Sequence, residues 1–195
     1  RPPRGIDAFA TACDETYDYI SKQLQLEVEA DMSVYLFTTT EQCLAATGHP
    51  ASYVEGLTIY TRLGAPVGGV IAEAMCNSMD PEAKAFPLVR DGIRNIFDER
   101  DHNIYWEARK YRFTPEWPTL QALVSGQATK DPAVYKYASA TFVAFLIQRY
   151  GVDQYKMLWR SVLELQPSLE KIYGSTLPQM EAEWIRILDL MAKKT

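Results

Sequence analysis

The sequence predicts an α+β protein in which a small mixed α/β lobe precedes a mostly helical lobe. Three observations predict this fold class. Helix-like and strand-like patterns alternate over residues 1–80, strand patterns disappear after Pro87, and a nearly continuous apolar helix pattern occupies residues 132–150. We therefore expect one domain over residues 1–195, built from a lobe at 1–80 and a lobe at 81–195.

The first lobe begins with an amphipathic helix and a short strand. Apolar residues recur at three- and four-residue steps, which is the helical period, at Ile6, Phe9, Cys13, Tyr17, Ile20 and Leu24. The β-rich segment "MSVYLF" at 32–37 predicts a strand. Thr38 and Glu41 have the spacing of a capping box, so they predict the start of a second helix, which ends at Gly48.

A second strand and a third helix complete this lobe. "EGLTIYTRL" at 55–63 predicts the strand, and "GAPVGG" at 64–69 predicts a turn. The turn lacks the lysine-serine or lysine-threonine ending of a phosphate-binding loop. The helix at 70–79 ends before Pro81, because proline cannot extend it, and it carries one glutamate, Glu73.

The second lobe is predicted to be helical apart from one excursion. Residues 87–100 have a helical pattern, whereas the charged and aromatic residues 98–118 are weakly periodic and predict a surface segment. Asp131 and Pro132 predict the start of a buried helix that ends at Gly151. Further helices are expected at 152–165, 168–174 and 176–194, the last of them with a Thr176/Gln179 capping box.

Charge and cysteine content restrict the function. The net charge is −5, which disfavours nucleic acid as a partner. No apolar run approaches the ~20 residues of a transmembrane segment. Cys13, Cys43 and Cys76 are expected to be free thiols, with a Cys13–Cys43 disulfide as the open alternative for an exported protein.

Two passages carry a resemblance to a known family. "YASATFVAFLIQRYGVDQYKMLW" at 137–159 and "SLEKIYGSTLPQMEAEWIRIL" at 168–188 resemble segments of the gluzincin-type metallopeptidases, in particular the peptidase MA-like domains. The resemblance implies a zincin-like fold. Because that family is commonly secreted or envelope-bound, and the chain begins at Arg1 without a methionine, we expect an extracytoplasmic location.

The resemblance also implies a degenerate site. In the family, two histidines of an HExxH helix bind zinc, the glutamate is the general base, and an acidic residue before a glycine is the third ligand. Matching these positions places the base at Glu73, the two histidines at Ala72 and Cys76, and the third ligand at Asp91. Alanine cannot coordinate a metal, and catalytic zinc needs three protein ligands and a water. We therefore expect no metal, no cofactor and no hydrolysis.

The predicted function is a non-catalytic pseudopeptidase module that binds a protein or peptide in the cleft between its lobes. Strand 55–63 would pair with the peptide backbone. Aromatic and arginine residues anchor interfaces, so the candidate binding residues are Tyr105, Trp106, Arg109 and Trp117. The simpler interpretation is that these aromatic side chains cover the helical lobe.

Two further hypotheses remain at this point. One is a hydrolase with a site rebuilt around Glu73, Cys76 and Asp91, and the other is a structural subunit whose cleft is filled by its own side chains. Each motif residue also has an ordinary structural interpretation. Glu73 suits a solvated or arginine-paired carboxylate, Cys76 a small buried side chain, and Asp91 a surface or capping acid.

Overall fold

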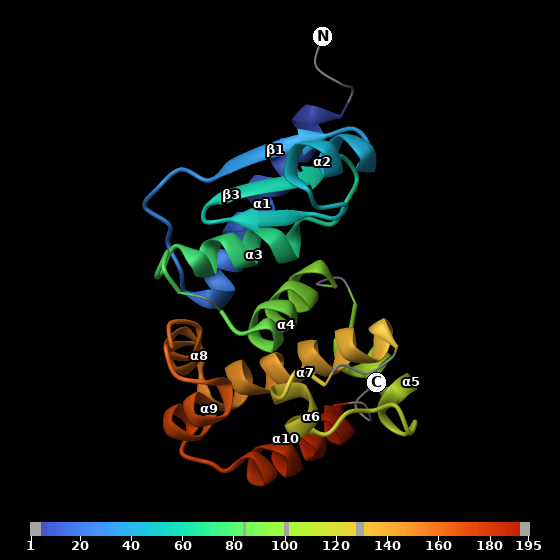
Figure 1. The fold of residues 1–195 in the computed structure, drawn as a ribbon, viewed down its shortest axis with the longest axis vertical. Helices are drawn as coiled ribbons and strands as arrows, with labels where there is room; N and C mark the ends of the chain where they lie inside the picture. Colours follow the sequence, from blue (N-terminus) through green and yellow to red (C-terminus); the bar gives the residue numbers. More distant parts are fainter. Residues whose placement is uncertain (1–4, 84, 100–101, 128–130, 192–195) are drawn as a thin grey trace. The chain divides into compact units, whose positions relative to one another are not determined.

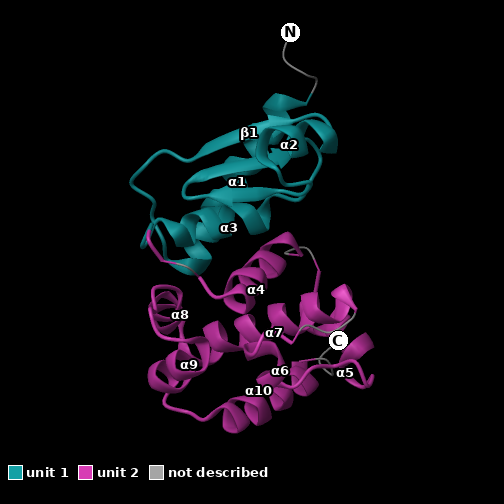
Figure 2. Ribbon diagram, viewed as in Figure 1, with its two compact units in different colours: residues 1–81 teal, residues 82–195 magenta. Residues whose placement is uncertain are grey.

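A computed structural model describes residues 5–83, 85–99, 102–127 and 131–191 of the chain, which divides into two compact units, residues 1–81 and 82–195 (Figures 1 and 2). The mixed α+β class is confirmed. Within the described residues, all strands belong to the first unit, and the second unit contains helices and their connections.

The first unit follows the predicted order of elements with one addition. Its elements are α1 (Ile6–Leu24), β1 (Ser33–Phe37), α2 (Thr40–Thr47), β2 (Tyr53–Glu55), β3 (Thr58–Arg62) and α3 (Gly68–Asn77). Strand β2 was not predicted, because a segment of three residues is too short to show an alternating pattern. A two-residue connection joins β2 to β3, and Gly56 there has a φ of 56°, which glycine adopts without strain.

The strands form a sheet of order β1-β3-β2, with β1 parallel and β2 antiparallel to β3. The segment predicted as a peptide-binding edge, 55–63, therefore contains the central strand, and that part of the hypothesis was wrong. The Ser33 N–H donates to the Leu57 carbonyl, and the Leu63 N–H donates to the Phe37 carbonyl. Since backbone groups alternate in direction along a strand, the N–H and C=O groups of Val34 and Leu36 point away from β3.

Helices cover this sheet and supply most of its core. Helix α3 packs against α1, β2 and β3, whereas α2 packs against β1 and β3. Every residue of α3 from Gly68 to Cys76 is buried. The helix is therefore the most buried element of the unit, which explains why its sequence is nearly free of charge.

The start of α2 differs by one residue from the prediction. The N-cap is Thr39, whose hydroxyl accepts a hydrogen bond from the Gln42 N–H at 3.2 Å. The Gln42 side-chain oxygen in turn accepts from the Thr38 N–H at 3.1 Å. Three consecutive threonines allow either register, and Gln42 rather than Glu41 bonds back to the residue before the N-cap. The helix ends at Gly48 as predicted, with a φ of 76°.

The second unit consists of helices arranged around α7. Its elements are α4 (Pro87–Asp98), α5 (Ile104–Arg112), α6 (Leu120–Val124), α7 (Pro132–Tyr150), α8 (Val152–Trp159), α9 (Leu165–Tyr173) and α10 (Leu177–Met191). Helices α4, α5, α8 and α10 all contact α7. The residues of α7 from Ala138 to Leu146 are all buried, so the predicted central helix is confirmed. In the described part of the chain, no helix combines the length and apolar character needed to cross a membrane.

The predicted surface excursion contains a helix. Asn103 caps α5, because its side-chain oxygen accepts hydrogen bonds from the N–H groups of Tyr105 and Trp106, each at 3.1 Å. Ile104, Tyr105 and Ala108 form the buried side of α5. This helix was not predicted within the surface segment, since its nine residues show only two turns of apolar period among many charges.

Candidate functional site

The motif residues of the first unit lie on one short, buried helix. A turn with Gly64 at a φ of 85° leads into α3, and Ala72 and Cys76 have no exposed surface. Glu73 is 7% exposed and is not an unpaired charge. A solvated carboxylate, one of the two ordinary interpretations of Glu73, is therefore wrong. Cys76 is a small buried side chain, as that interpretation expected, and it is not part of a disulfide.

The chemistry available on α3 is limited by these side chains. The Ala72 methyl group has no lone pair, so it offers nothing to a metal or to a proton. A fully buried thiol packs as a small side chain and is shielded from reagents in solution. Among the motif positions on α3, the carboxylate of Glu73 is the group suited to acid–base chemistry.

Asp91, the fourth motif residue, belongs to a polar cluster of the second unit. Its Oδ1 accepts a hydrogen bond from the Arg90 Nε at 3.1 Å, and its Oδ2 accepts one from the Tyr135 hydroxyl at 3.1 Å. Burial, the charge of Asp91 and this hydrogen bond raise the pKa of Tyr135, so the phenol stays protonated and continues to donate. Both oxygens of the half-buried carboxylate are thus engaged between α4 and α7.

A pocket of about 310 Å³ lies at this cluster, and a larger pocket of about 400 Å³ lies elsewhere in the second unit. Asp91, Asn95, Tyr135 and Lys136 line the smaller pocket. Acidic and basic groups are balanced there, so its charges do not favour a ligand of one sign.

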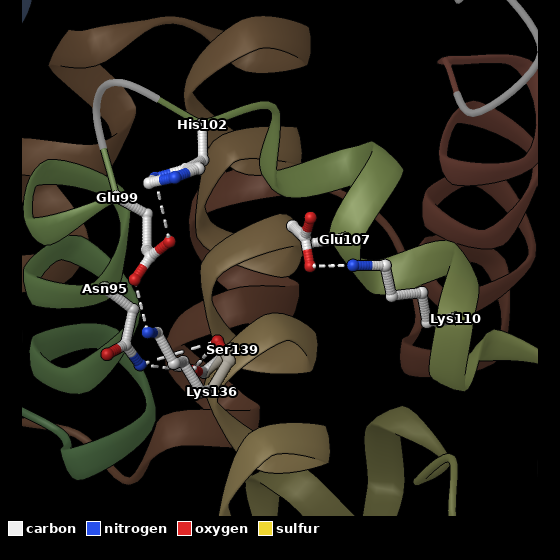
Figure 3. A network of polar contacts seen from close by, with 7 residues as sticks. All are labelled: Asn95, Glu99, His102, Glu107, Lys110, Lys136 and Ser139. Carbon is white, nitrogen blue, oxygen red and sulfur yellow. Dashed lines mark hydrogen bonds and ion pairs between the residues drawn. The ribbon is translucent and has the colours of Figure 1, made fainter.

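The same α4–α7 region contains an ion-pair network (Figure 3). The Lys136 ammonium bonds one oxygen of Glu99, and the His102 Nδ1 lies 3.4 Å from the other. Burial lowers the pKa of Lys136, but the hydrogen bond and charge of Glu99 outweigh it, and the net shift is upward. The Asn95 amide donates to the Ser139 hydroxyl at 3.1 Å beneath this pair. The network joins α4 to α7 and leaves His102 next to a carboxylate.

Two of the predicted binding residues differ sharply in exposure, although both lie on α5. Tyr105 is buried, and its hydroxyl donates to the Gln148 side-chain oxygen at 2.9 Å, so it belongs to the core. Trp106 is 43% exposed, and the Lys110 ammonium lies 4.4 Å from its ring centroid. Arg109 is also exposed. The exposed side of α5 thus presents an aromatic ring among cations.

Trp117 lies apart from this surface, in the loop that follows α5. It is half-buried, and its ring centroid is 5.8 Å from that of Trp184. It also lines the larger pocket, together with Phe113, Glu181 and Ile185. Glu181 was not among the predicted residues, because it lies on α10 and only the three-dimensional fold brings it to the same pocket as Trp117.

The described residues contain no group of three histidine, cysteine, aspartate or glutamate side chains placed to hold a metal ion. Neither a protein family, nor a curated protein, nor a solved structure matches this chain. Its function must therefore be inferred from the side chains themselves.

Proposed function

We propose that this chain is a non-catalytic, zincin-like module, related to the gluzincin peptidases of the peptidase MA-like group, that binds a protein or peptide. The observation that supports it best is the state of the motif positions. Ala72 presents a methyl group, Cys76 a fully buried thiol, and Asp91 a carboxylate that is already hydrogen-bonded through both oxygens.

Each of these states argues against the gluzincin mechanism. That mechanism uses three protein ligands to hold zinc and to lower the pKa of its water. A methyl group supplies no ligand. Recruiting Asp91 would remove the acceptor of the Tyr135 hydroxyl and of the Arg90 Nε, and both donors would then need another partner.

The outer edge of β1 is the surface best suited to a peptide. Val34 and Leu36 direct their backbone N–H and C=O groups away from β3, and Val34 and Tyr35 are 40% and 56% exposed. The strand "SVYLF" carries no charge or proline that would hinder pairing. The opposite edge, β2, is shorter and contains Glu55. An extended peptide would add to β1 through main-chain hydrogen bonds, with Tyr35 contacting its side chains.

The non-catalytic part is tested by metal content and activity. Purified protein is incubated with zinc chloride, passed through a desalting column, and measured by elemental analysis and by cleavage of casein and of a peptide library. We expect less than stoichiometric zinc and no cleavage. One zinc per chain, together with cleavage that Glu73→Gln abolishes, would instead establish the rebuilt hydrolase.

The binding part is tested on the edge of β1. A phage-displayed library of random 12-residue peptides is selected on the wild-type protein, and enriched peptides are measured against Val34→Pro and Val34→Thr. Proline removes an outward N–H and is tolerated on edge strands, whereas threonine keeps the backbone donor. We expect the peptides to lose binding to the proline variant alone. No enrichment, or equal binding to both variants, contradicts the proposal.

A further inference from the structure

The larger pocket of the second unit combines aromatic walls with a carboxylate. It lies where the end of α5 and the loop after it meet α10, and its volume is about 400 Å³. Phe113, Trp117 and Ile185 provide apolar surface, and Arg112 and Glu181 provide charge. Apolar and aromatic walls with a few polar groups are typical of ligand-binding pockets.

The charges of the pocket do not cancel. The Arg112 Nε lies 3.5 Å from Asp189 Oδ1, so this cation already has a counter-ion on α10. Within the described part of the chain, Glu181 has neither a hydrogen bond nor an ion pair. Arg112, Asp189 and Glu181 together carry one net negative charge, and that charge resides on the unpaired carboxylate. A cationic ligand is therefore favoured over an anionic one.

The aromatic rings of the pocket favour a guanidinium over an ammonium as the bound cation. Phe113 is 75% exposed, and the Arg112 guanidinium carbon lies 5.4 Å from its ring centroid. The protein's own guanidinium therefore lies over one face of this ring, and the high exposure of Phe113 leaves the other face accessible. A planar guanidinium can stack on an aromatic face and bind a carboxylate through two parallel N–H groups, which an ammonium cannot do.

We propose that this pocket binds an arginine side chain of a partner polypeptide. Its guanidinium makes a bidentate pair with Glu181 and stacks between Phe113 and Trp117, while its methylene groups cover Ile185. The site belongs to the second unit, whereas the β1 edge belongs to the first. The proposal does not rest on the proposed function, and either can fail while the other holds.

The indole signal of Trp117 gives a direct measurement of binding. The chain has four tryptophans, so a ¹⁵N–¹H spectrum of the full chain contains few indole N–H signals, and Trp117→Phe identifies the one that belongs to the pocket. The probe is the capped tripeptide acetyl-Gly-Arg-Gly-amide. Matched peptides carry citrulline, which keeps the shape of arginine without its charge, or lysine. We expect saturable movement of the Trp117 signal with arginine and at least about tenfold weaker binding of the other two.

Two variants separate the carboxylate from general acidity. Glu181→Gln removes the charge in the pocket, and we expect it to weaken arginine binding about tenfold. Glu116→Gln, at an exposed acid next to Trp117 that does not line the pocket, should leave the affinity unchanged. Equal binding of the citrulline or lysine peptide, an unchanged affinity of Glu181→Gln, or no movement of the Trp117 signal overturns the proposal.

Discussion

Gly92 of α4 lies directly against Val143 of α7. A β-carbon at Gly92 would come within 2.3 Å of the Val143 Cγ2 and 2.7 Å of the Ser139 carbonyl oxygen. The two helices therefore pack more closely than any side chain at position 92 allows. In this chain, the glycine that follows Asp91 has a packing role.

We expect Gly92→Ala to lower the free energy of unfolding by about 1–3 kcal/mol, because the added methyl group overpacks a rigid interface. Denaturant unfolding of the variant measures the loss. Val143→Ala in the same chain should recover part of it, since it removes the nearer of the two contacts, but not the part that arises from the Ser139 backbone. An unchanged stability of Gly92→Ala would show that α4 and α7 are farther apart than described.

The buried phenol of Tyr105 predicts a loss of stability in alkali. Burial raises the pKa of Tyr105 to about 12. The unfolded chain releases this proton near the ordinary pKa of about 10. The folded state thus holds more protons between these values, and the stability that is fully present below about pH 10 is lost as pH rises toward about 12.

The variant Tyr105→Phe tests whether the ionisation of Tyr105 lowers stability as pH rises. At neutral pH the variant loses the bond to Gln148, and we expect it to be about 0.5–1.5 kcal/mol less stable than the wild type. Because phenylalanine does not ionise, the deficit should shrink as pH rises from 9 to 11.5 in denaturant titrations. A deficit that grows over this range contradicts the placement of Tyr105 in the core.

The three thiols should react at different rates. Cys43 and Cys76 are buried, whereas Cys13 is partly exposed. Burial, followed by the charge of Asp14, raises the pKa of Cys13, so little of it is thiolate at pH 7. With a disulfide reagent, we expect one thiol to react slowly at pH 7 and faster at pH 9, and three to react in denaturant. Cys13→Ser should abolish the native reaction, and rapid native labelling of Cys76 would contradict the burial of α3.

The pair between Lys136 and Glu99 should contribute little by itself. Both side chains are partly exposed, at 35% and 19%, so solvent screens their attraction. We expect Glu99→Gln to cost up to about 1 kcal/mol, and less in 1 M salt than in 0.05 M salt. Lys110, which pairs with Glu107 on the surface of α5 at 2.7 Å, gives a control through Glu107→Gln. If Glu99→Gln lowers the free energy of unfolding by the same amount at both salt concentrations, the loss comes from packing rather than from charge.

Most of the fold could be predicted, because the spacing of apolar residues and the residues that begin and end helices are local properties of the sequence. The long apolar spacing of α1, and Asp131 and Gly151 around α7, fixed their helices to within a residue. Strand β2 and helix α5 were missed for the same physical reason. Each is short, and its stability comes from partners far along the chain, such as Gln148 for Tyr105.

The candidate sites were less predictable than the fold. Sequence spacing identified Glu73, Cys76 and Asp91 as residues of interest, but the bonds that engage Asp91 come from its neighbour Arg90 and from Tyr135, which lies 44 residues away. Trp117 was noticed for its residue type, whereas Glu181 has no local signal that distinguishes it from any other helix carboxylate. Contacts between residues so far apart in the sequence depend on tertiary structure, and the local pattern of a single sequence does not predict them.

The central position of α7 has a consequence for how the second unit comes apart. Helices α4, α5, α8 and α10 all pack against α7. Exposing the middle of α7 to solvent therefore requires several of these helices to separate from it at the same time. Amide hydrogens between Ala138 and Leu146 should then exchange with solvent only through complete unfolding of the unit, and limited digestion should begin elsewhere in it.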